Sequence, residues 1–167
     1  VAAQTTFNAL APAILIKNSG ANAATDPDIV LRRIRLICTG PGTGLTMLQA
    51  AAVIDTGTRY TSGGSPMTGL NNNTAVTTVS NAQIFNASVA IVASAAGSGT
   101  RLINNVRMRT GIPVLGDEFV FNFGAEPSPE TGLISGTTAS RFGCAMGNVA
   151  IAPGGTFMLY LWGTGQT

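Results

Sequence analysis

The sequence predicts an all-β protein, a single-domain jelly-roll-type antiparallel β-sandwich with roughly eight to ten strands and an extended N-terminal arm. Apolar runs are short, and clusters of Gly, Pro, Asn and Ser separate them at the spacing of a sandwich. No stretch of about ten or more residues keeps apolar residues at the i, i+3, i+4, i+7 positions of a helix without interruption by Gly, Pro or β-branched residues. The 167 residues are enough for one domain with its own core.

Residues 1–27 are predicted to form the arm, with extended pieces at 5–10 and 13–17, and residues 28–167 to form the sandwich domain. The stretch DIVLRRIRLICT, residues 28–39, is the clearest early strand. Strict alternation divides this strand into two faces, because successive side chains point to opposite sides. One face carries Val30, Arg32, Ile34, Leu36 and Cys38, and the other carries Leu31, Arg33, Arg35 and Ile37.

After the turn GPGTG, residues 45–54 are predicted to form a long Ala-rich strand. Residues 55–83 have few apolar side chains and are predicted to be a long loop with short strand pieces around 75–79. A loop of this length inside a compact domain is often functional. Further strands are expected at 84–94, 101–110, 118–124, 140–145, 148–152 and 157–162, the last two as a closing hairpin.

The last predicted strand is apolar on both faces. Phe157, Leu159 and Leu161 form its ordinary core face. Met158, Tyr160 and Trp162 form a second apolar face, which a two-sheet sandwich does not need. Tyr, Trp and Met are enriched where partners meet, so these three residues are predicted to lie at a subunit interface near a trimer axis. The alternative is that the N-terminal arm of the same subunit covers them.

The chain carries unusually little charge. Charged residues make up 10% of the chain, against roughly 25% in typical soluble domains, and the mean hydropathy is +0.32. Strand alternation directs neighbouring arginines to opposite faces, which argues against the basic stripe of a nucleic-acid-binding protein. No stretch approaches the roughly 18 apolar residues of a transmembrane helix, and nothing resembles a signal peptide. The sequence therefore predicts synthesis in the cytoplasm, with neither nucleic acid nor membrane as partner.

Residues for common catalytic chemistry are missing from the sequence. There is no histidine, which excludes Ser-His-Asp and Cys-His arrangements and removes the commonest metal ligand. The turn GPGTG lacks the lysine of a phosphate-binding loop. Asp117 and Glu118 are adjacent on a predicted strand and point to opposite faces, whereas Glu126 and Glu130 lie in a Pro-rich loop. The expectation is a non-enzymatic protein without a cofactor.

Two chemical features stay open in the sequence. Cys38 and Cys144 are expected to be free, mostly buried thiols, but sequence does not decide whether they form a disulfide. A calcium site at Asp26, Asp28 or Asp55 is also left open, because loop carboxylates and carbonyls suffice for one.

Two segments of the sequence carry a family resemblance. The early stretch DIVLRRIRLICTGPGTGLTMLQAAAV, the Gly-, Thr- and Asn-rich middle and the final NVAIAPGGTFMLYLWG resemble small virion proteins of tailed bacteriophages. The chain is most similar to the jelly-roll, TNF-like cement or decoration proteins of phage heads. That resemblance implies a homotrimer on the outer surface of the capsid, which binds the major capsid protein and stabilises the shell. It carries no catalytic residues over to this chain.

Two other non-enzymatic functions fit the same pattern. The first is a binding module, either a phage tail or fibre tip or a lectin-like sandwich, in which the loop at 55–83 presents Arg59 and Tyr60. The second is a single-jelly-roll shell protein of a small virus. Such proteins often carry a basic arm, whereas residues 1–27 contain one lysine and no arginine.

Overall fold

A computed structural model describes the fold of the chain. It describes residues 4, 6–22, 24–40, 47–67, 81–97, 100–102, 107–110, 114–123 and 149–164. These residues form eleven strands and contain no helix, and every pairing between the strands is antiparallel. The all-β prediction is confirmed.

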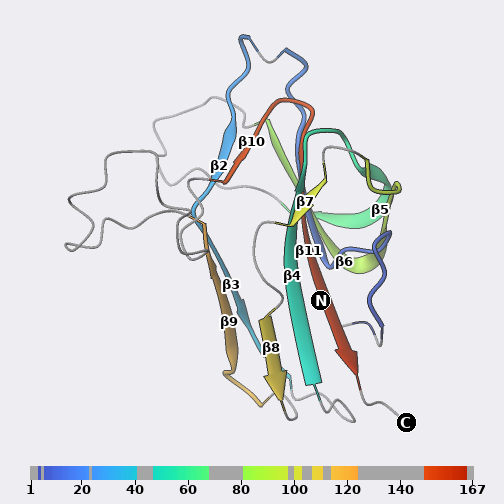
Figure 1. Cartoon of the computed structure of the whole chain (residues 1–167), viewed down its shortest axis with the longest axis vertical. Helices are drawn as coiled ribbons and strands as arrows, with labels where there is room; N and C mark the ends of the chain where they lie inside the picture. Colours follow the sequence, from blue (N-terminus) through green and yellow to red (C-terminus); the bar gives the residue numbers. More distant parts are fainter. Residues whose placement is uncertain are drawn as a thin grey trace, which may run out of the picture.

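Most strands belong to one seven-stranded sheet (Figure 1). Its order is β5 (Tyr60–Met67), β6 (Ala82–Ala93), β1 (Ile14–Asn18), β11 (Thr156–Thr164), β4 (Met47–Asp55) and β7 (Arg101–Leu102), with β8 (Arg107–Thr110) also paired to β4. The long central pair of β4 and β11 runs in register from Thr156 opposite Asp55 to Thr164 opposite Met47.

Two small sheets cover one face of the large one. The first pairs β2 (Ile29–Leu31) with β10 (Val149–Ile151), and the second pairs β3 (Arg33–Ile37) with β9 (Glu118–Asn122). A continuous core lies between the layers, formed by Ile16, Ala50, Ala52, Phe121, Phe123, Val149, Ile151, Phe157 and Leu159. This arrangement is consistent with a β-sandwich. The jelly-roll topology stays a prediction, because residues 124–148, which connect β9 to β10, lie outside the described residues.

The predicted domain boundary at residue 27 differs from the structure. Strand β1, residues Ile14–Asn18, lies inside the large sheet, where it pairs with β6 on one side and β11 on the other. Leu15 and Ile16 are buried on opposite faces of that sheet. The sheet therefore begins at Ile14, within the segment that the sequence assigned to the arm.

The predicted strand at 28–39 is two strands, β2 and β3, separated at Arg32. Ile29 and Leu31 pack toward the core before the break, and Ile34 and Leu36 pack toward it afterwards. Two consecutive residues, Arg32 and Arg33, are therefore exposed between inward-facing neighbours. The predicted assignment of side chains to the two faces was therefore wrong for the first half of the strand. One irregular residue shifts the alternation of inward and outward side chains by one position.

The last two strands are not a hairpin. β10 pairs with β2, whereas β11 pairs with β1 and β4, so the turn at residues 153–155 carries the chain from one layer to the other. The turn is attached to Asn18 at the end of β1: the Gly154 amide donates to the Asn18 carbonyl at 3.1 Å, and the Asn18 amide donates to the Gly155 carbonyl at 3.0 Å. Gly154 has a φ of 80°, a conformation that favours glycine.

Strand β5 occupies part of the predicted loop at 55–83. Gly63 and Gly64 have φ values of 76° and 74°, and a Cβ at Gly63 would lie 2.0 Å from the Ala90 carbonyl oxygen. Glycine is therefore required where β5 bends closely against β6. The predicted strand pieces at 75–79 and the strand at 140–145 lie outside the described residues.

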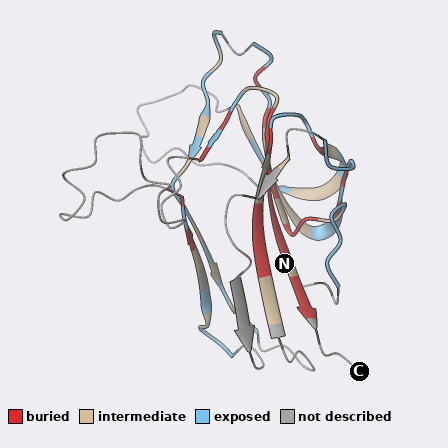
Figure 2. Ribbon diagram, in the orientation of Figure 1, coloured by how far each residue is buried: buried red, intermediate tan, exposed pale blue. Residues whose placement is uncertain are grey.

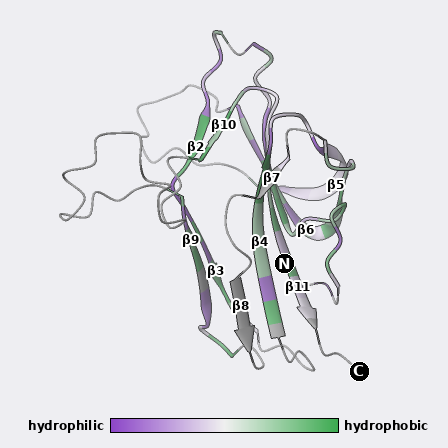
Figure 3. Cartoon of the chain, viewed as in Figure 1, coloured by the Kyte–Doolittle hydropathy of each residue, from purple (hydrophilic) through white to green (hydrophobic). Residues whose placement is uncertain are grey.

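Burial follows the central strands. Figure 2 shows buried residues along much of β4 and β11, and Figure 3 shows hydrophobic residues along β2 and β4.

Within the described residues, no helix is long and apolar enough to span a membrane.

Candidate functional site

The three residues predicted to form a subunit interface lie together on one side of β11, which we call its second face. Met158, Tyr160 and Trp162 are 0%, 3% and 8% exposed within a single chain. They pack with Leu15 of β1, Ala51 of β4 and Ile91 and Ala93 of β6. Within a single chain these side chains are already buried, so the chain itself supplies the first layer over them.

The cover comes from the leading segment, residues 4 and 6–13, as the alternative interpretation of the sequence proposed. The Phe7 ring lies edge-on to the Trp162 ring, with centroids 5.0 Å apart, and is tilted against the Tyr160 ring at 5.2 Å. The Tyr160 hydroxyl donates a hydrogen bond to the Ala9 carbonyl at 2.9 Å. Burial raises the pKa of Tyr160, while the charge of Arg59 lowers it and that of Asp55 raises it.

The leading segment also occupies a free backbone edge of β11. Strand β1 pairs with β11 only from Thr156 to Leu159, and the Ala13 amide then donates to the Leu159 carbonyl at 2.8 Å. Beyond that point Gln4 forms a parallel bridge with Trp162. Its amide donates to the Leu161 carbonyl at 3.1 Å, and its carbonyl accepts from the Gly163 amide at 2.6 Å. The segment therefore satisfies an edge that would otherwise be open.

The outer side of the leading segment remains exposed. Phe7 and Leu10 are 51% and 46% exposed. A turn at residues 8–11 reverses the chain, with the Ala11 amide donating to the Asn8 carbonyl at 3.1 Å. One further backbone bond holds this turn to the large sheet, from the Ala93 amide to the Leu10 carbonyl at 2.8 Å.

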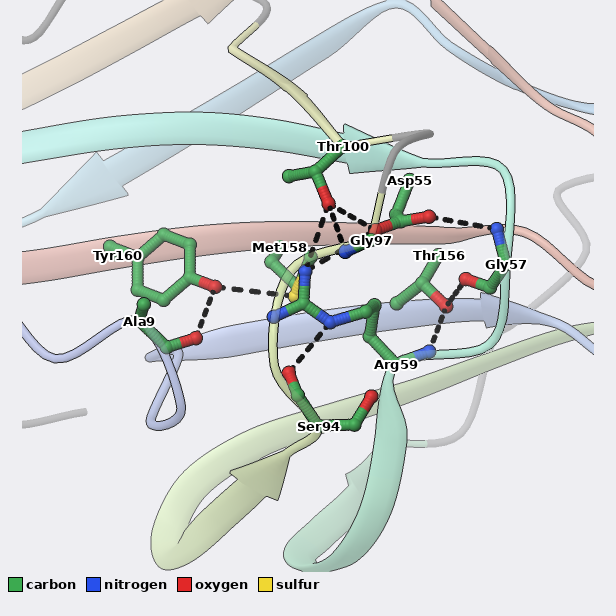
Figure 4. Close-up of polar contacts among 10 residues, drawn as sticks. All are labelled: Ala9, Asp55, Gly57, Arg59, Ser94, Gly97, Thr100, Thr156, Met158 and Tyr160. Carbon is green, nitrogen blue, oxygen red and sulfur yellow. Dashed lines mark hydrogen bonds and ion pairs between the residues drawn. The ribbon is translucent and has the colours of Figure 1, made fainter.

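A buried polar network lies where β4 ends and β11 begins (Figure 4). An Arg59 Nη1–Asp55 Oδ2 ion pair of 3.2 Å forms its centre, and both side chains are 5% exposed. Thr100 donates to the same carboxylate oxygen, and the Gly57 amide donates to the other at 2.9 Å. Arg59 Nε also donates to the Ser94 carbonyl at 2.7 Å.

Thr156 joins this network to the first residue of β11. Its hydroxyl donates to the Gly57 carbonyl and accepts from the Arg59 amide, each at 3.0 Å. Burial alone would raise the pKa of Asp55, but hydrogen bonds from Thr100, Gly57 and Arg59 and the Arg59 charge outweigh burial and hold that pKa below its usual value. The network fastens the turns after β4 and β6 to the start of β11.

The predicted calcium ligands do not converge among the described residues. Asp55 is engaged by Arg59, Thr100 and Gly57, whereas the Asp26 carboxylate accepts from the amides of Ala21 and Asn22. The part of the chain that the structure describes holds no group of three or more potential metal-ligating side chains.

The loop that was proposed to present Arg59 and Tyr60 to a ligand directs both inward. Arg59 is buried in the polar network, and the Tyr60 ring stacks on Phe85 with centroids 4.4 Å apart. Lys17 Nζ lies 5.7 Å from the Tyr60 ring centroid. Sequence reasoning missed the buried ion pair, although Asp55 and Arg59 are spaced i, i+4 beside a turn, which was the available signal.

The two small sheets expose a mixed surface that the sequence did not predict, which we call the outer surface. The phase change at Arg32 puts Val30, Arg33, Arg35 and Ile37 on the side away from the core. Exposed Val114 and Leu115 directly precede the residues that pair with Cys38: the Cys38 amide donates to the Asp117 carbonyl, and the Gly116 amide donates to the Cys38 carbonyl. Leu115 is 72% exposed, and Arg35 forms an exposed ion pair with Glu118.

The structure describes only some of the cysteines and loop carboxylates that the sequence singled out. Cys38 is a free, half-buried thiol at the end of β3. Cys144, Glu126 and Glu130 lie outside the described residues.

Comparisons of the chain with protein-family models, with curated proteins and with solved structures found no match. Two arrangements of the described residues concern surfaces: the second face of β11, which the leading segment covers, and the outer surface of the small sheets.

Proposed function

We propose that this chain is a non-enzymatic structural protein that works by surface contact, as a homotrimeric cement or decoration protein on the outside of a phage capsid. The sequence resemblance supports the phage assignment, and the all-β fold is compatible with it. The major capsid protein is the proposed partner.

The observation that carries this proposal is the outer surface of the small sheets. Large apolar side chains and arginines are exposed together there: Arg33, Arg35 and Ile37 follow one another on β3, and exposed Val114 and Leu115 precede the residues that pair with Cys38. Exposed apolar groups beside arginines are typical of protein-contact surfaces. Strands hold these side chains in fixed positions, so little conformational entropy would be lost when a partner covers them.

Binding to the particle tests this proposal directly. Purified protein is mixed with expanded capsids of the phage whose genome carries the gene, and cosedimentation is measured. Ile37→Asp and Arg35→Glu should each reduce binding by tenfold or more, since each places a charge of the wrong kind in the contact (about 1.4 kcal/mol for each factor of ten).

Val89→Asp is the matched control. Val89 is an exposed apolar residue of β6, in the large sheet and away from the outer surface. This variant should bind as the unchanged protein does. Absence of capsid binding by the unchanged protein, or a gene that lies in no phage or prophage genome, would overturn the proposal.

A further inference from the structure

We propose that the site beside β11 accepts the leading segment of a second copy of this chain, so that subunits associate by exchanging these segments. The inference rests on the self-association part of the proposed function, and it names the surface and the occupant. Figure 1 shows the leading segment, dark blue before β1, beside β6 at the side of the large sheet away from the small sheets.

The site has two kinds of recognition element. The free edge of β11 offers the Leu161 carbonyl and the Gly163 amide, which hold the backbone of Gln4 as an added strand would be held. The Tyr160 and Trp162 rings offer an aromatic surface for one ring, occupied by Phe7. An occupant therefore needs extended backbone followed three residues later by an aromatic side chain.

The segment is joined to the rest of the fold by a turn that can open locally. Within the segment, residues 8–11 are held by the Ala11–Asn8 bond, by the Leu10 amide donating to Asn8 Oδ1 at 2.9 Å, and by Gln4 Nε2 donating to the Ala11 carbonyl at 2.5 Å. Among the described residues, only two hydrogen bonds join this turn to the large sheet, from the Ala93 amide to the Leu10 carbonyl and from the Tyr160 hydroxyl to the Ala9 carbonyl. The side chains of Asn8, Ala9 and Leu10 are all exposed. If this turn opens, Gln4 and Phe7 leave their site while Ala13 keeps its bond to Leu159.

An open turn leaves a site that must be covered again. Tyr160 and Trp162 would meet water, and the Leu161 carbonyl and Gly163 amide would lose their partners. The same segment of a second copy supplies the identical Gln4 backbone groups and Phe7 ring, so exchange restores the contacts at the edge of β11 and on the Tyr160 and Trp162 rings. Residues 1–16 contain no charged side chain, so no charge repulsion opposes the approach of a second segment. A ring of such exchanges closes a homo-oligomer.

Trp162 reports on this site directly, because it is the only tryptophan of the chain. The acceptor copy lacks residues 1–11 and keeps Trp162, and the donor copy carries Trp162→Phe and an intact segment. Mixing them should shift the acceptor emission to shorter wavelength, toward that of the intact protein. A donor that also carries Phe7→Ala is the matched control and should lose most of the shift.

A synthetic peptide of residues 1–11 tests whether the site binds the segment, independently of whether two copies exchange it. If the peptide shifts the acceptor emission and the donor copy does not, the site accepts the segment but copies do not exchange it, and the inference is overturned. An acceptor that shifts with neither peptide nor donor overturns it as well.

The intact chain provides a second measurement that does not depend on the folding of the shortened copy. Light scattering should show an oligomer that excess peptide of residues 1–11 converts to monomer, whereas the Phe7→Ala peptide should not. A monomeric chain, or an oligomer whose mass the peptide leaves unchanged, contradicts segment exchange. A monomer that still binds capsids would overturn this inference and the proposed trimer but leave the capsid-binding role, whereas an exchanging oligomer that binds no capsids would overturn the capsid-binding role and leave this inference.

Discussion

The two faces of β11 are both buried, but by different kinds of cover. Phe157 and Leu159 face the small sheets, where Phe157 meets Phe123 with ring centroids 5.5 Å apart in a core shared by five or more strands. Met158, Tyr160 and Trp162 face the leading segment, β1 and β6. The first cover is built into the sandwich, whereas part of the second is the leading segment, in which Phe7 and Leu10 are themselves about half exposed.

This difference separates folding from association. A side chain sealed between sheets is uncovered only by global unfolding, but an exposed segment held by few backbone bonds can detach by local opening. Met158, Tyr160 and Trp162 do share one face of β11, as the alternation predicted, and the first layer over them belongs to the same chain. The comparison predicts that changes at the first face lower the stability of the whole fold, whereas changes at the leading segment act locally.

The largest effect is expected at the first face. Phe157→Ala removes a fully buried ring from the core between the layers. It should lower the free energy of unfolding by about 3–5 kcal/mol, because a cavity remains where the ring was. Urea denaturation measures this loss, and a loss below about 1 kcal/mol would show that the two faces are equally loosely covered.

The polar network at the start of β11 should rank next. Asp55→Asn leaves the buried Arg59 charge without its anion and should cost about 3 kcal/mol in urea denaturation. Adding Arg59→Met to Asp55→Asn should recover much of that loss, since no unpaired charge then remains. If the double variant is no more stable than Asp55→Asn, the ion pair is not the reason for the loss.

The same carboxylate predicts a pH dependence. The pKa of Asp55 is lower in the folded chain than the ordinary value of about 3.9 expected in the unfolded chain. Its contribution to stability is therefore complete above about pH 4 and is lost as the pH falls through the lower, folded pKa. Denaturation midpoints of the unchanged protein should fall over that range more steeply than those of the Asp55→Asn, Arg59→Met double variant, and parallel curves would contradict this assignment.

A smaller effect is expected at the leading segment. Phe7→Ala removes a ring that is already half exposed, so the free energy of unfolding should fall by only about 1 kcal/mol. The same change should raise acrylamide quenching of Trp162, because the ring covers that side chain. Unchanged quenching would show that Phe7 does not cover the second face in solution.

The smallest effect is expected at the exposed pair of Arg35 and Glu118. Arg35→Ala should change the free energy of unfolding by less than about 1 kcal/mol, because both side chains are largely in solvent. A larger loss would mean that the outer surface supports the fold and does not only present side chains for contact.

Local patterns predicted most strands, but not how they are joined. Alternation and turn signals placed β1, β4, β6, β9 and β11 within a few residues. They did not reveal the phase change at Arg32, because a strand irregularity leaves the surrounding apolar pattern intact. The predicted hairpin at the end of the chain was wrong for another reason. Strands that are adjacent in sequence often pair, but here the Asn18 side chain, at the end of β1, donates a hydrogen bond to the Ile151 carbonyl just before the turn at 153–155. The two residues are more than 130 positions apart in the sequence.

The candidate site shows the same limit. The excess apolar face of Met158, Tyr160 and Trp162 was visible in the sequence, because its residues alternate with the core face. The N-terminal arm was named only as an alternative cover, because Gln4 and Phe7 stand in a short polar and apolar mixture without strand periodicity. Strand β5 was missed because its Gly, Ser and Thr side chains carry no apolar signal.

Amide hydrogen exchange measured by NMR tests the central claim, that the leading segment closes the second face and edge of β11. The amides of Gly163 and Ala93 donate to the carbonyls of Gln4 and Leu10. Both should exchange slowly in the intact chain and much faster once residues 1–11 are removed, while the amides of the β4–β11 ladder stay protected. Equal exchange of Gly163 and Ala93 in the two proteins, with the ladder protected in both, would contradict the claim.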